Sequence, residues 1–215
     1  MFLERSKLRK SGSHLLVFAV AACWSVADRC AADTAAPITL TFDEIPFQSV
    51  DGLVHAGVSF DFKIGGVDST EAFYNSFGPG TLTFVDDPSL TGDSTGVLTL
   101  DFVVPTSVVE FGLALNTTDA LSPGFRVELF SENLMSLGET PVNVSPTVGA
   151  LGFSENRFEY LGVAVSRAII RFDHQPGSFA LDNLTFLPVP EPSAFGLGAF
   201  GLIAFLQGFR TNRNR

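Results

Sequence analysis

Apolar and polar residues alternate along most of the middle of the chain, and this period of two constrains the fold more than any other feature. Alternation places one face of a strand against a core and the other against solvent. Alternating or strand-like runs occupy 38–43, 58–62, 82–85, 97–102, 108–115, 125–129, 158–165, 168–173 and 179–186. Turns such as Gly78-Pro79-Gly80 separate them, and no long window keeps a helical period. The pattern predicts an all-β fold, an antiparallel β-sandwich of the jelly-roll kind.

The predicted sandwich, residues 38–187, is strongly acidic. It contains five Lys and Arg against 19 Asp and Glu, which gives a net charge of −14. A field of this sign repels nucleic acid and anionic membranes unless divalent cations intervene. We therefore expect no nucleic-acid partner.

Residues 1–32 have the organisation of a secretory signal peptide. Four of the first ten residues are basic, an apolar run follows at 15–22, and small residues come next. As a helix this run rises only about 12 Å, too short for a bilayer core of about 30 Å. Cleavage fits after Ala27 or after Ala32, and a lipobox-like Val20-Ala21-Ala22-Cys23 leaves lipidation at Cys23 as an alternative. The sequence thus predicts export across the inner membrane.

Residues 188–215 contain three parts in order: a Pro-rich break, an apolar segment at 194–209 and a basic tail at 210–215. As a helix, 194–209 would span about 24 Å, short but sufficient for a transmembrane anchor with local thinning. Arg210, Arg213 and Arg215 would stay cytoplasmic by the positive-inside rule, with the sandwich outside.

This tail resembles the PEP-CTERM sorting signal of Gram-negative bacteria that make extracellular polysaccharide. The matching residues are Val189, Pro190, Glu191, Pro192 and Ser193, followed by the apolar segment and the arginines. The resemblance implies an exosortase, a membrane-embedded cysteine transpeptidase, as a partner that cuts near Pro-Glu-Pro. It also implies a protein first anchored in the inner membrane and then displayed at the cell surface or released.

The two ends of the sandwich resemble jelly-roll carbohydrate-binding modules. The resemblance rests on Thr41-Phe42-Asp43 in the first strand and Ala180-Leu181-Asp182-Asn183-Leu184 in the last. It implies that these strands are neighbours and share a structural calcium. Asp43, Glu44, Asp182 and Asn183 would be its ligands, since calcium binds six to eight hard oxygens. The alternative is that these residues only cap strand ends.

A cluster of aromatic residues marks a candidate ligand platform. Phe73, Tyr74, Asn75 and Phe77 lie together in a stretch bounded by Gly78 and Pro79. Sugar faces stack on aromatic rings, so this cluster could bind a glycan. The alternative is that the rings pack beneath the loop.

No catalytic constellation is visible. The sandwich has two histidines, His55 and His174, no cysteine and no Gly-x-Ser-x-Gly motif, so we expect neither a transition-metal site nor a serine nucleophile. A glycosidase carboxylate pair is defined by a separation in space of about 5–9.5 Å, so a small polysaccharide-acting hydrolase stays open. An adhesin or ice-binding role is a further alternative, suggested by the tail alone. The leading expectation is a non-enzymatic exported β-sandwich associated with extracellular polysaccharide.

Overall fold

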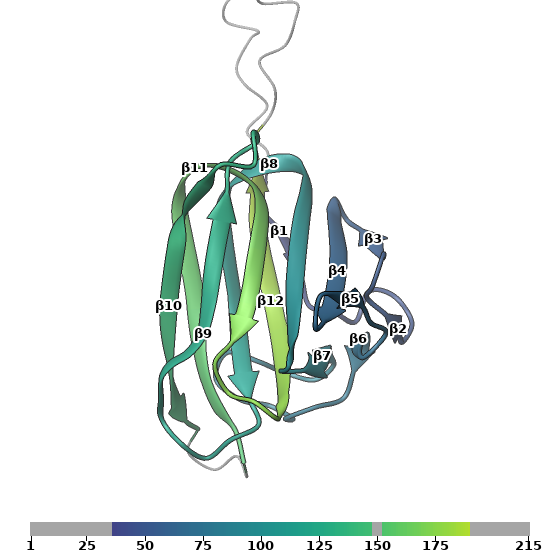
Figure 1. The fold of residues 1–215 in the computed structure, drawn as a ribbon. Helices are drawn as coiled ribbons and strands as arrows, with labels where there is room; N and C mark the ends of the chain where they lie inside the picture. The colour runs from purple at the N-terminus through teal and green to yellow at the C-terminus, as the bar shows by residue number, and fades with distance from the viewer. Residues whose placement is uncertain (1–35, 148–151, 190–215) are drawn as a thin grey trace, which may run out of the picture. The chain divides into compact units, whose positions relative to one another are not determined.

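The computed structural model describes residues 36–147 and 152–189, and all regular secondary structure in these ranges is β-strand (Figure 1). Within them no helix is long and apolar enough to cross a membrane. The predicted signal peptide, the apolar segment 194–209 and the basic tail lie outside the described residues. Of the predicted sorting motif, Val189 alone lies within them.

Twelve strands form one antiparallel hydrogen-bonded network. They are β1 (Ile38–Leu40), β2 (Gln48–Ser49), β3 (Val54–His55), β4 (Val58–Ile64), β5 (Val67–Asp68), β6 (Ala72–Ser76), β7 (Ser89–Asp93), β8 (Gly96–Leu115), β9 (Leu121–Phe130), β10 (Ser136–Pro146), β11 (Ser154–Phe172) and β12 (Ser178–Pro188). The main order is β10-β9-β11-β8-β12-β7-β6-β2, while β4 pairs with β8 and β1 with β12.

The two longest strands, β8 and β11, belong to both layers of a sandwich. Residues 97–101 of β8 pair with 167–171 of β11, and these halves continue into β4 and β9. We call this sheet layer I. Residues 106–115 of β8 pair instead with β12 and with the first half of β11, and β12 continues into β7 and β6. We call this sheet layer II; the register of β11 on β8 shifts between Leu161 and Val165, where the chain changes layer.

A Phe-rich core fills the space between the layers. Phe172 of layer I and Phe179 of layer II stack with ring centroids 4.2 Å apart. Phe60, Leu113 and Leu181 are fully buried beside them. The predicted antiparallel β-sandwich of the jelly-roll kind is confirmed, and so is the expected neighbourhood of the first and last strands, because Thr39 in β1 lies opposite Thr185 in β12.

Two expectations about strands are corrected. Segments 97–102 and 108–115 are one strand, β8, because the strand bends between layers without a turn. In the same way, 158–165 and 168–172 both belong to β11. The strand expected at 82–85 is wrong, because these residues cross the outer face of layer II and their amides bind side chains there.

Residues 77–88, which we call the cover loop, lie on the outer face of layer II. Val85 of the loop packs against Ala114 and Ala180, which point away from the main core. Gly112 is required beneath the loop, since a Cβ atom there would lie 1.9 Å from the carbonyl oxygen of Phe84. The loop therefore forms a third, partial layer.

Candidate functional site

An open groove of about 370 Å³ lies on the outer face of layer II beside the cover loop. Residues of β6, β7 and the start of β12 form its floor, and Phe77–Pro79 and Phe153 contribute to its walls. Its lining combines aromatic rings with carboxylates.

Strand alternation decides which side chains reach the groove. Ala72 and Tyr74 of β6 are buried in the core, so Glu71 and Phe73 face outward. On β7, Thr91 and Asp93 face the groove, and Gly92 lies between them. A Cβ atom at Gly92 would lie 2.7 Å from the ring of Phe179, so this position needs glycine.

Phenylalanine rings give the groove its apolar surface. Phe77 is 82% exposed. Phe73 stacks on the exposed ring of Phe47 with centroids 5.0 Å apart and planes 12° apart. The lining residues include the carboxylates of Glu71 and Asp93 and no Lys or Arg. The arrangement offers flat apolar rings next to hydrogen-bond acceptors.

The wall that carries Phe77 is held by two acids of the cover loop. The Asp87 carboxylate accepts hydrogen bonds from the amides of Gly78 (2.9 Å) and Gly80 (3.0 Å). The Asp86 carboxylate accepts one from the Thr81 hydroxyl (2.7 Å). These acids therefore act within the turn, and the wall is ordered by charge-assisted bonds.

Two buried carboxylates fasten the cover loop to layer II. Glu155 of β11 accepts hydrogen bonds from the amides of Thr83 (2.9 Å) and Phe84 (2.8 Å). Asp182 of β12 accepts one from the amide of Asp86 (2.9 Å). Both acids are nearly inaccessible to solvent. The two carboxylates thus supply the hydrogen-bond acceptors that a neighbouring strand would otherwise offer to the loop amides.

The pKa values of Asp182 and Glu44 are shifted in opposite directions. Burial raises the pKa of Asp182 to about 6; hydrogen bonds from the amides of Asp86 and Asn183 lower it only in part, and the nearby Asp86 and Glu44 carboxylates raise it. Burial also acts to raise the pKa of Glu44, but hydrogen bonds from the Tyr74 hydroxyl and the Thr41 amide prevail and lower it. Glu44 therefore stays ionised more readily than Asp182.

The structure divides the predicted ligand platform. Phe73 and Phe77 both line the groove. The interpretation of Tyr74 as an exposed platform residue is wrong: its ring is fully buried, and its hydroxyl donates to Glu44. Asn75 is occupied as well, because its amide donates to the carbonyl oxygen of Ile45 at 2.7 Å. The sequence held a signal for this division, since Glu71 places Phe73 on the polar face and Tyr74 on the other.

The side chains of all four predicted calcium ligands have hydrogen-bond partners within the protein. Asp43 accepts the Thr41 hydroxyl (2.8 Å), and Glu44 accepts the Thr41 amide (2.7 Å). Asp182 accepts the Asn183 amide (2.6 Å), and the Asn183 side chain donates to the Phe84 carbonyl oxygen (3.3 Å). Calcium binding by these residues stays a prediction. A rise in the unfolding midpoint with added calcium that disappears in Asp182→Ala would support it.

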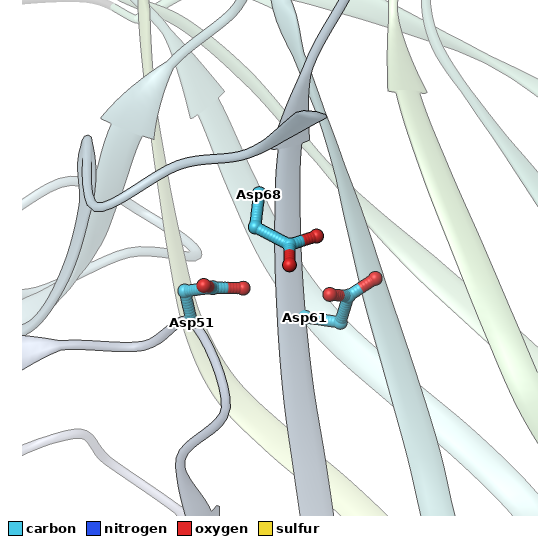
Figure 2. Close-up of side chains that lie close together, drawn as sticks. All are labelled: Asp51, Asp61 and Asp68. Carbon is cyan, nitrogen blue, oxygen red and sulfur yellow. The ribbon is translucent and has the colours of Figure 1, made fainter. Parts of the chain in front are cut away.

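A group of three carboxylates that the sequence analysis missed lies at the edge of layer I. Asp51, Asp61 and Asp68 each place one oxygen within 4.8 Å of the others (Figure 2). The Lys63 ammonium lies 2.8 Å from oxygens of both Asp61 and Asp68. These hydrogen bonds raise the pKa of Lys63 above its usual value. The group is thus an ion-paired cluster at the surface.

Other residues of the groove carried no sequence signal of their own. Phe153 and Ser178 lie more than 70 residues from Phe77 along the chain, and only the pairing of β12 with β7 brings Ser178 opposite Asp93. The fold and the groove define an antiparallel β-sandwich with an aromatic, acidic groove on one outer face.

No protein-family model matches the chain, and no curated protein matches it. Among solved structures it is similar to the K2 cleaved adhesin domain of Lys-gingipain, with 15% identity, a TM-score of 0.44 and coverage of 72% of this chain and 99% of that chain. It is also similar to a family 29 carbohydrate-binding module from Piromyces equi (13% identity, TM-score 0.36, 73% and 92% covered). A family 22 xylan-binding domain from Paenibacillus barcinonensis gives 15% identity and a TM-score of 0.35, with 75% and 99% covered. Identities and TM-scores this low do not indicate which ligand this chain binds.

Proposed function

We propose that this chain is an exported, non-enzymatic protein that binds extracellular polysaccharide in the groove beside Phe77. The observation that carries the proposal is the open groove, in which an 82% exposed phenylalanine stands beside two carboxylates on a rigid sheet. Aromatic rings offer apolar faces to the C–H surfaces of sugars, and carboxylates accept hydrogen bonds from their hydroxyls.

Charge favours a neutral polysaccharide. The lining residues bring Glu71 and Asp93 and no cation, and the sandwich carries an excess of acids. Polymers of uronic acids or sulfated sugars would meet repulsion at this surface. Neutral glycans, and glycans with amino groups, would not.

Export belongs to the same proposal and rests on the sequence. The basic and apolar N-terminus and the Pro-Glu-Pro tail support passage across the inner membrane, anchoring through 194–209 and processing by an exosortase. We expect the mature surface protein to begin near residue 33. N-terminal sequencing and the intact mass of protein from the cell surface test this part.

Affinity electrophoresis tests the groove. We expect gels containing a neutral β-glycan to retard the protein, and gels containing a polyuronate to leave its migration unchanged. Phe77→Ala should abolish the retardation. Val67→Ala is the matched control, because Val67 is also an exposed apolar residue but does not line the groove. Equal retardation of both variants would place the glycan elsewhere.

A polysaccharide-acting hydrolase is the second candidate, because Glu71 and Asp93 share the groove. The Asp93 carboxylate already accepts the Thr95 amide at 2.7 Å, which favours a turn-forming role. Asp182, whose pKa is raised to about 6, lies under the cover loop and outside the groove lining. We expect no release of reducing ends from a bound glycan. Release that Glu71→Gln abolishes would establish the hydrolase instead.

A further inference from the structure

One end of the sandwich is formed by apolar connections, and the described chain also stops there, at Val189. Strand pairing brings together the β3–β4 hairpin (54–58), the crossing of β8 (103–105), the β9–β10 hairpin (131–135) and the crossing of β11 (161–165). The Val189 amide donates to the carbonyl oxygen of Pro105 at 2.8 Å. In Figure 1, β8 and β11 change layer at the upper end. We call these segments, with Val189, the apolar tip.

The apolar tip carries several exposed aliphatic side chains. Leu161 is 83% exposed. Val54, Val103, Leu134, Met135 and Val163 are exposed as well. The segments contain a single charged residue, Glu132. Contiguous exposed apolar surface of this kind marks an interaction site.

We infer that the apolar tip rests on the lipid surface of the membrane that receives the segment 194–209. Only residues 190–193 separate Val189 from that segment, and four extended residues reach about 14 Å. Any chain that inserts 194–209 therefore holds the tip close to the bilayer. Exposed aliphatic side chains on four segments at that distance from the bilayer are expected to bury their apolar surface in lipid rather than leave it in water.

Charge defines the class of lipid. The tip has no Lys or Arg and has one carboxylate, Glu132, so its contact does not depend on anionic headgroups. Zwitterionic lipid, such as phosphatidylcholine, meets no electrostatic barrier there. We therefore expect the contact to persist at high salt.

This orientation places the groove away from the membrane. β12 runs from Ser178, which lines the groove, to Pro188 at the tip, and its 11 residues span roughly 35 Å. When the apolar tip contacts the membrane, the groove at the other end of β12 therefore faces the extracellular space. The inference does not require the groove to bind a glycan.

Depth-dependent fluorescence quenching tests the contact in the full chain, inserted into phosphatidylcholine vesicles. Cys23 and Cys30 are first changed to Ser, and an environment-sensitive dye is attached to Leu161→Cys, Met135→Cys or the control Thr118→Cys. Thr118 is exposed and follows the opposite end of β8. We expect a lipid-borne quencher near the headgroups to reduce emission several-fold at positions 161 and 135, and to leave position 118 unchanged.

Three outcomes would overturn the inference. Absence of quenching at positions 161 and 135 would show that the tip stays in water. Emission that is shifted to the blue without lipid quenching would show that the segment 194–209 or another apolar part of the chain covers the tip. Dye self-quenching that grows with the density of the protein would show that a second copy covers it.

Discussion

The carboxylate of Asp182 accepts a hydrogen bond from the backbone amide of Asp86 across 96 positions of sequence, at 2.9 Å. This bond fastens the cover loop to layer II, and the loop in turn carries Phe77 into the groove wall. Asp182 is only 3% exposed. A buried acid of β12 therefore supports the binding surface without contacting a ligand.

The raised pKa of Asp182 predicts that the stability of the protein depends on pH. Its pKa rises from 3.8 to about 6 on folding, so the folded state holds the proton more tightly than the unfolded state. The resulting stabilisation is complete below about pH 4 and is lost as the pH rises through about 6, by up to about 3 kcal/mol. Asp182→Asn should remove this component. Denaturant unfolding of both proteins from pH 4 to 7 measures it, and identical slopes would contradict the assignment.

The hydrogen bonds of Glu155 predict a large loss of stability when its side chain is shortened to alanine. Glu155→Ala removes the acceptor of the amides of the exposed Thr83 and the half-buried Phe84, and a hydrogen bond to a charged group contributes about 1.5–3 kcal/mol. We expect a matching fall in the free energy of unfolding, with faster hydrogen exchange in the cover loop. Glu159→Ala is the control: its exposed pair with Arg157 should contribute less than about 1 kcal/mol. Equal losses in both variants would refute the fastening role of Glu155.

The close approach of the cover loop to Gly112 predicts that a larger residue there would displace the loop. In Gly112→Ala the new Cβ atom would overlap the Phe84 carbonyl oxygen, so the cover loop must move away from layer II. Overpacking of this kind costs about 1–3 kcal/mol. We expect weaker glycan binding together with the lost stability, and a wild-type unfolding midpoint would show that the loop is not held there.

The sequence located many of the strands and part of the groove, but it did not predict β6, β7 or β10. Alternation located β4 and β9, because each has one buried face and one more accessible face; β12 was located as well, although its residues 179–182 are buried on both faces beneath the cover loop. The alternation is interrupted at the layer crossings in β8 and β11, so the sequence predicted two strands where each is a single strand that serves both layers. Only the paired register shows the change of layer.

Buried polar groups were beyond reach for a different reason. Glu155 and Asp182 are buried because the amides of the cover loop need acceptors, and no local pattern shows which amides lack a strand partner. For Tyr74 the packing alternative is the right one, and the alternation around Glu71 is the sequence signal that places its ring in the core. Phe77 is exposed, as a platform residue must be, and its binding role stays a prediction.

Hydrogen exchange of the protein with and without a neutral β-glycan tests the central claim most directly. We expect slower exchange at residues 71–80, 91–93 and 177–180, which form the groove, and no change at the apolar tip. Phe77→Ala should remove this protection without altering exchange elsewhere. Two results would contradict the proposal that the groove is the binding site: unchanged exchange at the groove in the presence of a glycan that retards the protein in a gel, or protection confined to another surface.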